Sequence, residues 1–205
     1  LNLQEAIIEY ANSNKPLLRI KGKERDLEWR MFGEHNARNA MAASLAANQY
    51  GISIEDSIRS LQKFKGVSKR QDILLDTSKL IIIEDFAHHP TAIKTTIEGV
   101  KKNYPEHRLT ALIELRSNTM KSGLHDNALA EAVMMADKVH WKSEDHVQIK
   151  RLVNSLPDKS TQLDNNEKFI SELESMHLKN DIVIIMSNGN FDGLAAALLD
   201  RFGND

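Results

Sequence analysis

Short apolar runs alternate with helical patterns from Gly66 to Asp205, and this alternation constrains the fold more than any other feature of the chain. The apolar runs predict strands at 73–75, 80–83, 109–113, 138–141 and 181–186. Helical spacing follows at 91–103, 124–135, 146–156, 167–177 and 193–202. Such alternation is typical of an α/β fold with a Rossmann-like, mostly parallel, doubly wound sheet. The first two strands are separated by only four residues, 76–79, too few for a helical crossover, so we expect one antiparallel strand.

Three polar clusters each follow a predicted strand directly, at 84–90 (EDFAHHP), 114–123 (ELRSNTMKSG) and 186–193 (MSNGNFDG). The carboxyl ends of parallel strands meet at the same edge of a sheet, and in open α/β sheets ligands bind at that edge. The sequence therefore predicts one crevice that collects charged and polar side chains. Its expected members are Asp85, His88, Arg116, Lys121 and Ser187.

The composition limits the possible partners. With 205 residues, 41% hydrophobic and 27% charged, the chain has room for one large domain or for a domain and a fragment. A net charge of -2 and 5% aromatic residues give neither a positive field nor a stacking platform for nucleic acid, so we expect no nucleic-acid partner. The chain has no cysteine, no long apolar run and no signal-peptide pattern, so we expect a cytoplasmic protein without a membrane span. Its first residue is Leu and not Met, so we expect the chain to be a piece of a longer protein.

The stretch before Gly66 has a different pattern. Two short strands are predicted at 17–20 and 27–32, around a turn at 21–23. An alanine-rich helix is predicted at 36–49, and a second helix runs from Ile54 to Phe64. Ser53 and Asp56 at its start resemble a capping box.

Several side chains in these segments suit nucleotide chemistry. Asn36 and Asn39 are three residues apart on one helix face, and carboxamides can both donate to and accept from a purine edge. Asn36 could instead serve only as a helix N-cap. Arg70 lies between the two parts of the chain, and its guanidinium suits a phosphate, although it could also be a solvated hinge charge.

The later loops suit a peptide with several carboxylates. Residues 116–121 (RSNTMK) offer two cations and three neutral hydrogen-bonding side chains. Ser187 and Asn188 could bind a carboxylate together with the N-terminus of the following helix. Each loop could also be merely a polar surface loop. His88 and His89 could serve a metal-dependent hydrolase, but their side chains diverge on an extended loop, no third ligand is evident, and we predict no metal site.

These motifs together resemble the Mur ligase superfamily. The run DFAHHP is similar to its D(Y/F)(A/G)HxP motif, and GEHNARNAMAA, from Gly33, is similar to GxHNxxNxxAA. Arg70, the RSNTMK run and the segment 187–191 follow in the order and spacing of the branch of murein tripeptide ligases. The resemblance extends from Gly33 to the end of the chain. Departures from that branch are Leu115 for a proline, Asn190 for a glycine and Glu84 for an aspartate.

The resemblance implies an ATP-dependent amide-bond ligase that acts through an acyl phosphate. It would join L-Ala-γ-D-Glu-meso-diaminopimelate, salvaged in peptidoglycan recycling, to UDP-N-acetylmuramate. By the same resemblance His35, Asn36, Asn39, Asp85 and Arg70 would contact ATP, and Arg70, His88 and Lys121 would be catalytic. The residues expected to bind the tripeptide are His88, Arg116, Ser117, Asn118, Thr119, Lys121, Ser187 and Asn188.

The resemblance also implies a division of the chain. Residues 1–65 would be the C-terminal remnant of a central ATP-binding domain, and residues 66–205 a substrate-binding C-terminal domain. No GxxxxGK(S/T) phosphate loop occurs in the chain, so we expect this loop, most ligands of Mg²⁺ and the N-terminal domain to lie elsewhere in the same polypeptide. Alternatives are a sister Mur ligase that adds a single amino acid, and a non-catalytic nucleotide- or peptide-binding module.

Overall fold

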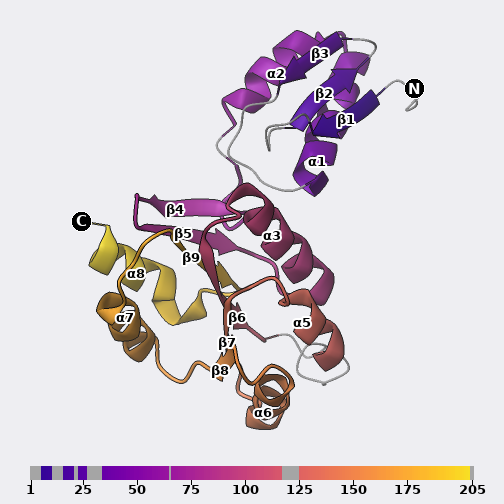
Figure 1. Cartoon of the computed structure of the whole chain (residues 1–205). Coiled ribbons are helices and arrows are strands. Elements are labelled where there is room, and N and C mark those ends of the chain that lie inside the picture. Colours follow the sequence, from indigo (N-terminus) through magenta and orange to yellow (C-terminus); the bar gives the residue numbers. More distant parts are fainter. Residues whose placement is uncertain are drawn as a thin grey trace. The chain divides into compact units, whose positions relative to one another are not determined.

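The computed structural model describes residues 6–10, 16–20, 23–26, 34–64, 66–116 and 125–203 of the chain. The chain divides into two compact units, Leu1–Gly66 and Val67–Asp205 (Figure 1). Among the described residues, no helix is long and apolar enough to cross a membrane.

The first unit contains a small antiparallel sheet and two helices. Strands β1 (Ala6–Tyr10), β2 (Pro16–Ile20) and β3 (Lys23–Asp26) pair in chain order, and α1 (Glu34–Gln49) lies against β1 and β2. Helix α2 (Ile54–Gln62) packs on α1. The core between the two helices consists of Ala40, Leu45, Ile54 and Ile58.

Local signals account for the helix ends in this unit. The backbone of Gly51 is left-handed, with φ of 85°, and this conformation favours glycine where α1 has ended. At the start of α2, the Ser53 hydroxyl accepts a hydrogen bond from the Asp56 backbone N–H at 3.0 Å. The same hydroxyl donates to the Asp56 carboxylate, so the predicted cap is confirmed with Asp in the place usually taken by Glu or Gln.

The strands of the first unit were harder to predict than its helices. The predicted strand at 17–20 is confirmed as β2, whereas the whole range 27–32 lies outside the described residues. Strand β3 (Lys23–Asp26) lies between these two predicted ranges. Strand β1 was not predicted. Helix α1 begins at Glu34, before Asn36, so Asn36 lies within its first turn and the N-cap hypothesis for this residue is wrong.

The second unit is built on a six-stranded sheet with the order β4-β5-β9-β6-β7-β8. Its strands are β4 (Asp72–Asp76), β5 (Leu80–Asp85), β6 (Arg108–Glu114), β7 (Lys138–Lys142), β8 (Ser160–Gln162) and β9 (Asp181–Met186). Only β4 is antiparallel to its neighbour, and all the other pairs are parallel. The three central strands are almost continuously apolar, as expected for strands that are covered on both faces.

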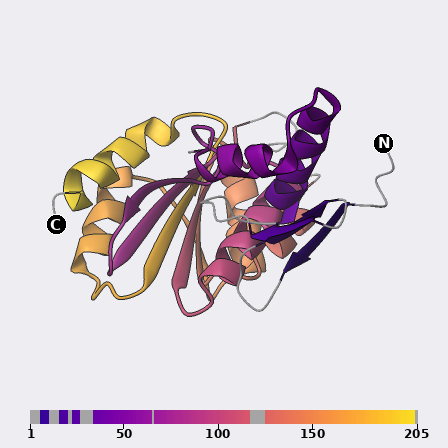
Figure 2. The ribbon, with the colours of Figure 1, turned by 90° about the horizontal axis from the view of Figure 1, so that it is seen from above.

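Helices cover both faces of this sheet. In Figures 1 and 2, α7 (Asn166–Ser175) and α8 (Leu194–Phe202) lie on one face, and α3 (Pro90–Asn103) and α5 (Asp126–Ala132) lie on the other. Helix α6 (His146–Ser155) packs beside α5. On the α7 and α8 face, the core includes Ile82, Leu112 and Ile185 from three strands, together with Leu173 and Leu198 from the helices. The predicted Rossmann-like, doubly wound sheet with one antiparallel strand is therefore confirmed.

Two details of the second unit differ from the prediction. Helix α5 covers only Asp126–Ala132, a shorter range than the predicted 124–135, and Leu124 lies outside the described residues. Strand β8 was not predicted, because its three residues, Ser160–Gln162, contain no apolar run. It pairs with β7 alone at the edge of the sheet, where a polar strand is tolerated.

Candidate functional site

The carboxyl ends of β5, β9 and β6 meet at one edge of the second unit. Asp85 pairs with Met186 across β5 and β9, and Ile113 pairs with Met186 across β6 and β9. One residue later, the Ser187 backbone N–H donates to the Asp85 carbonyl at 3.1 Å. The three polar clusters therefore begin side by side, although they are far apart in the sequence.

Asp85 is buried at this edge, with 4% of its surface exposed. One carboxylate oxygen accepts a hydrogen bond from the Gln71 backbone N–H at 2.8 Å, and the other accepts from the Ala87 N–H at 2.7 Å. Backbone donors of this kind favour the ionised form of a carboxylate. Asp85 thus joins the start of the second unit to the loop that follows β5.

The segment around Arg70 has an unusual backbone. Lys69 and Gln71, on either side of Arg70, both adopt left-handed conformations, with φ of 58° and 52°. Such conformations are unfavourable for residues other than glycine and persist where the surroundings hold them. Here the Phe86 N–H donates to the Lys69 carbonyl at 2.7 Å, in addition to the bond between Gln71 and Asp85.

Side chains reinforce this attachment. The Lys69 ammonium donates to the Gly189 carbonyl at 2.6 Å and lies 3.4 Å from the carboxylate of Glu84. The exposed Arg70 guanidinium lies over the Phe86 ring, 5.3 Å from its centroid. Arg70 therefore projects from a loop that is fastened to the ends of β5 and β9.

The two histidines of the first cluster have different surroundings. A ring nitrogen of His88, Nδ1, lies 2.9 Å from the Phe86 carbonyl, which indicates that this nitrogen carries the proton in the neutral ring. His89 is exposed and precedes α3, and its ring lies 5.2 Å from that of His125. In the described part of the chain, no group of three or more His, Cys, Asp or Glu side chains could hold a metal ion.

Arg116 follows β6 and extends across the glycine of the third cluster. A Cβ atom on Gly189 would lie 2.5 Å from Arg116 Nη1, so the arginine could not lie this close to a larger residue unless its flexible side chain shifted. Arg116 Nη1 is 3.9 Å from the buried carboxylate of Glu114, whose Oε2 accepts a hydrogen bond from the Ser187 hydroxyl. Arg116 itself is exposed at this edge and can meet an anionic ligand.

Ser187 and Asn188 differ in what they can offer a ligand. The Ser187 hydroxyl donates to Glu114 and accepts from the Gly189 N–H at 2.8 Å, so it mainly holds the loop. The carboxamide oxygen of Asn188 is buried, and no described residue donates to it. Helix α8 begins only at Leu194, after the short 3-10 helix η2 (Phe191–Gly193), so the expected helix N-terminus does not follow these residues directly.

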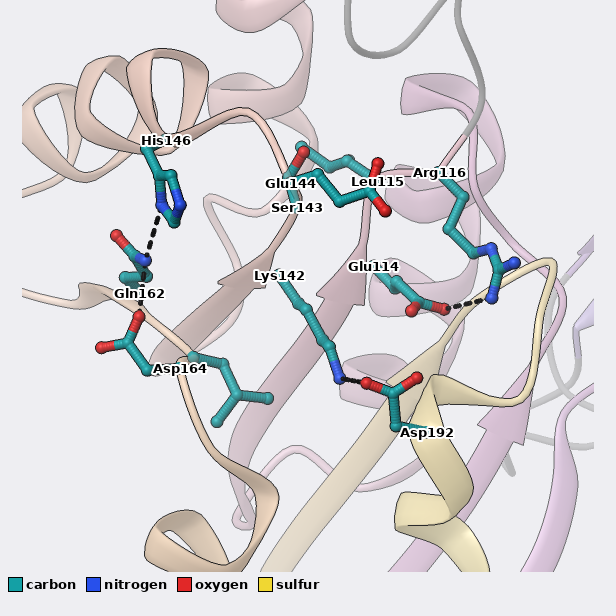
Figure 3. Close-up of a pocket in the computed structure, with 11 residues that line it drawn as sticks. Glu114, Leu115, Arg116, Lys142, Ser143, Glu144, His146, Gln162, Asp164 and Asp192 are labelled. Atoms are coloured by element: carbon teal, nitrogen blue, oxygen red, sulfur yellow. Dashed lines mark hydrogen bonds and ion pairs between the residues drawn. The ribbon is translucent and has the colours of Figure 1, made fainter.

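Two residues that the sequence analysis did not select lie beside Arg116. Lys142 ends β7, and its ammonium is hydrogen-bonded to the carboxylate of Asp192 in η2 (Figure 3). This bond, with a smaller effect of Arg116, lowers the pKa of the Asp192 carboxyl. Both residues line a cavity of about 390 Å³ that also includes Arg116, Glu114 and His146. The only sequence signal for Lys142 was its place at a strand's carboxyl end.

The remaining predicted residues lie elsewhere. Asn36 is buried in the first turn of α1, with 7% exposure, while His35 is partly buried and Asn39 is exposed. All three belong to the first unit. Four of the residues proposed for the tripeptide lie outside the described residues: Ser117, Asn118, Thr119 and Lys121.

Comparisons with known proteins agree with this architecture. Residues 69–189, more than half of the chain, match the family model for the glutamate ligase domain of Mur ligases. The UDP-N-acetylmuramate–L-alanyl-γ-D-glutamyl-meso-2,6-diaminoheptandioate ligase of Haemophilus influenzae is 29% identical over 182 residues, which are 87% of this chain and 40% of that protein. The Escherichia coli ligase of the same name is 31% identical over 180 residues, which are 85% of this chain and 39% of that protein.

Solved structures give the same result. A murein peptide ligase from Psychrobacter arcticus is 32% identical, with a TM-score of 0.65 over 98% of this chain and 44% of that one. A UDP-N-acetylmuramate–alanine ligase from Thermotoga maritima shares the fold at 18% identity, with a TM-score of 0.76 over 98% of this chain and 46% of that one. The chain thus spans about 40% of the length of the curated relatives. The match over residues 69–189 and the shared fold together show that the chain belongs to the Mur ligase family.

Proposed function

We propose that the chain is part of an ATP-dependent ligase that joins L-Ala-γ-D-Glu-meso-diaminopimelate to UDP-N-acetylmuramate in peptidoglycan recycling. The observation that carries the proposal is the charged edge at the ends of β5, β9 and β6, where Arg70, Asp85 and Arg116 come together in one unit. The names of the relatives from Haemophilus influenzae and Escherichia coli support this choice of peptide substrate.

The two units take different parts in this proposal. The first unit, Leu1–Gly66, is the C-terminal remnant of a central ATP-binding domain, and the second, Val67–Asp205, is the substrate-binding domain. The phosphate loop and most ligands of Mg²⁺ belong to parts of the polypeptide outside the 205 residues. This division agrees with the share of about 40% that the chain covers in its curated relatives.

ATP has suitable partners in both units. We assign the adenine to Asn36 and Asn39, with His35 nearby, because neighbouring carboxamides on one helix face can donate to and accept from a purine edge. We assign Asp85 to the ribose hydroxyls, because a carboxylate accepts hydrogen bonds from hydroxyl groups and this one lies at the carboxyl end of β5. Arg70, exposed at the start of the second unit, is assigned to the γ-phosphate.

The reaction requires an acyl phosphate and an amine that attacks it. ATP first phosphorylates the muramoyl carboxylate, and the α-amino group of the tripeptide then displaces the phosphate to form the amide. Arg70 and Lys121 offset the charge that develops on the phosphate, and His88 lies near the reacting groups. Arg116, with Ser117, Asn118, Thr119, Ser187 and Asn188, orients the peptide. Mg²⁺ would add charge stabilisation from ligands outside the described residues.

The test uses the full-length protein from which this chain comes. Purified protein is incubated with UDP-N-acetylmuramate, ATP and either the tripeptide or L-alanine, and amide product and ADP are measured separately. We expect the tripeptide to be used with a specificity constant at least a hundredfold above that of L-alanine. A preference for L-alanine would instead identify a ligase that adds a single amino acid, as the likeness to the Thermotoga maritima structure would allow.

A further inference from the structure

The cavity beside Arg116 lies over the ends of β6 and β7 and over the segment that follows β8 (Figure 3). Its volume of about 390 Å³ is at the lower end of the range for small-molecule sites, roughly 300 to 1,000 Å³. Acidic and basic side chains both line it, so its ligand preference depends on which of these charges already form ion pairs within the protein. The charged side chains differ in how strongly they are paired.

Lys142 is held firmly in this cavity. Only 21% of its side chain is exposed, and its ammonium lies 5.2 Å from the centroid of the Phe191 ring, which is itself buried. The backbone carbonyl of Lys142 accepts a hydrogen bond from the Leu115 N–H at 2.8 Å, which joins the ends of β6 and β7. The lysine therefore has little freedom to turn away from the cavity.

Asp192 is held quite differently. Its side chain is 68% exposed, and it belongs to a turn in which Phe191, Asp192 and Gly193 all have left-handed backbones, with φ of 49°, 49° and 76°. The Asn190 side chain supports this turn by accepting a hydrogen bond from the Asp192 N–H at 3.2 Å. Asn166 supports it from α7 by donating to the Phe191 carbonyl at 3.1 Å.

The exposed fractions of the two side chains decide whether Lys142 or Asp192 can leave their ion pair. An ion pair with an exposed carboxylate contributes little, because water solvates the acid almost as well as the lysine does. Separation of the ion pair would cost Lys142 more free energy than it costs Asp192, because water can solvate less of the lysine side chain. The carboxylate of Asp192 can therefore be replaced by another carboxylate, whereas Lys142 stays in place.

The other charges of the cavity are arranged differently. Arg116 is exposed and lies 3.9 Å from Glu114, a distance that leaves its guanidinium available to a ligand. Asp164 accepts a hydrogen bond from the Gln162 carboxamide, and none of the described ion pairs involves it. Leu115 and Asn190, two of the positions where the chain departs from the branch that it resembles, both contact the Lys142 and Asp192 pair.

We propose that Asp192 is an internal stand-in for a ligand carboxylate: it occupies Lys142 in the free protein and is displaced when a peptide carboxylate binds between Lys142 and Arg116. Asp192 thereby sets how strongly the cavity selects anionic ligands, and Lys142 provides the contact. The identity of that ligand as the tripeptide rests on the proposed function, whereas the displacement of one carboxylate by another does not.

The experiment is isothermal titration calorimetry of the 205-residue chain at low ionic strength, where surface charges are least screened. The probes are glutarate, which has carboxylates and no amino group, and the tripeptide L-Ala-γ-D-Glu-meso-diaminopimelate. The variants are Asp192→Asn, Lys142→Met and their combination, because Asn tolerates a left-handed backbone and preserves the turn. Asp164→Asn is the matched control, since it removes the same charge from the same cavity without releasing a lysine.

We expect Asp192→Asn to tighten glutarate binding about two- to fivefold, and Lys142→Met to weaken it about tenfold. In the Lys142→Met background Asp192→Asn should give no gain, and Asp164→Asn should change affinity less than Asp192→Asn does. Weaker or unchanged binding by Asp192→Asn would overturn the proposal, as would the absence of measurable glutarate binding in every variant. If glutarate responds as expected but the tripeptide does not bind, the inference stands and the proposed function fails.

Discussion

Arg116 shows how one residue depends on a distant one. Its guanidinium lies across Gly189, where a Cβ atom would be 2.5 Å from Nη1. The neighbouring carboxylate of Glu114 accepts a hydrogen bond from the Ser187 hydroxyl. The glycine and the serine belong to the loop after β9, so Arg116 is placed by a neighbouring strand and not by its own loop alone. This placement leaves its planar fork exposed toward the edge of the sheet.

Replacing Arg116 by lysine in the full-length protein should impair use of the tripeptide and not of ATP. Lysine retains the charge but loses the second of two parallel hydrogen bonds to a carboxylate. Since such bonds contribute roughly 1.5 to 3 kcal/mol, the specificity constant for tripeptide should fall about tenfold to a hundredfold. Steady-state kinetics with each substrate varied separately measures this. An equal loss for both substrates would assign Arg116 to phosphate contact or to structure.

His140, on β7, should make stability depend on pH. Burial lowers its pKa from 6.5 to about 4 in the folded protein, and its Nδ1 lies 2.9 Å from the Thr161 hydroxyl. Between these pH values the unfolded chain binds more protons than the folded one. The free energy of unfolding should therefore be unaffected above about pH 6.5 and should fall as the pH drops toward 4, by at most about 3 kcal/mol.

Urea unfolding of the 205-residue chain at pH 7.5 and pH 4.5 measures this effect. The variant His140→Gln retains a polar side chain of similar size but does not titrate. We expect the loss of stability between the two pH values to be smaller in the variant than in the natural chain, by roughly 1 to 3 kcal/mol. Equal losses in the two proteins would show that other groups cause the pH dependence.

At the scale of elements, the start of the second unit is fastened to the ends of two strands. The carboxylate of Asp85 holds Gln71, the Phe86 N–H holds the Lys69 carbonyl, and the Lys69 ammonium reaches the Gly189 carbonyl. Left-handed backbones at Lys69 and Gln71 are maintained by these contacts. A ligand that binds Arg70 would therefore contact a loop that is hydrogen-bonded to the ends of β5 and β9.

Replacing Asp85 by asparagine should destabilise the second unit. The carboxamide presents an N–H₂ group to one of the two backbone N–H donors that the carboxylate now accepts, so at least one charge-assisted hydrogen bond is lost. We expect the free energy of unfolding, measured in urea, to fall by roughly 1.5 to 3 kcal/mol. The control Asp76→Asn, at an exposed position on β4, should change it by less than about 0.5 kcal/mol. A similar, small effect of both substitutions would contradict this account of Asp85.

At the scale of the whole molecule, the chain contains two compact units and lacks a phosphate loop in its 205 residues. The family to which it belongs is shown by the second unit, in which the match covers residues 69–189. The binding groups proposed for ATP are divided between the units, with Asn36 and Asn39 in the first and Asp85 in the second. Because the 205 residues contain no phosphate loop, we expect nucleotide chemistry to need more of the polypeptide.

The purified 205-residue chain should fold but neither hydrolyse ATP nor ligate tripeptide. Without a phosphate loop it has no cradle for the β- and γ-phosphates, so any binding of ATP through Asn36, Asn39 and Asp85 should be weak. A coupled assay for ADP, with the full-length protein as the positive control, measures this. Steady ATP hydrolysis by the pure chain would refute the expectation.

The sequence by itself determined most elements of the second unit and the kind of sheet that they form. The apolar run Leu80–Ile83 predicts a strand covered on both faces, and Ser53 with Asp56 predicts the start of α2. The short connection between the strands predicted at 73–75 and 80–83 predicts the antiparallel pairing of β4 and β5. These features depend on neighbours within a few residues, which a local pattern records. The polar strand β8 escaped prediction because it carries no such pattern.

Only the tertiary structure decided which of these elements are neighbours and which charges meet. It places β9 between β5 and β6, Gly189 beneath Arg116, and Asp192 against Lys142, 50 residues away in the sequence. Periodicity records that a side chain is buried but not which chain segment buries it. The Lys142 and Asp192 pair depends further on three consecutive left-handed residues, two of which are not glycine, and a backbone that local preferences disfavour forms only where the packed fold holds it.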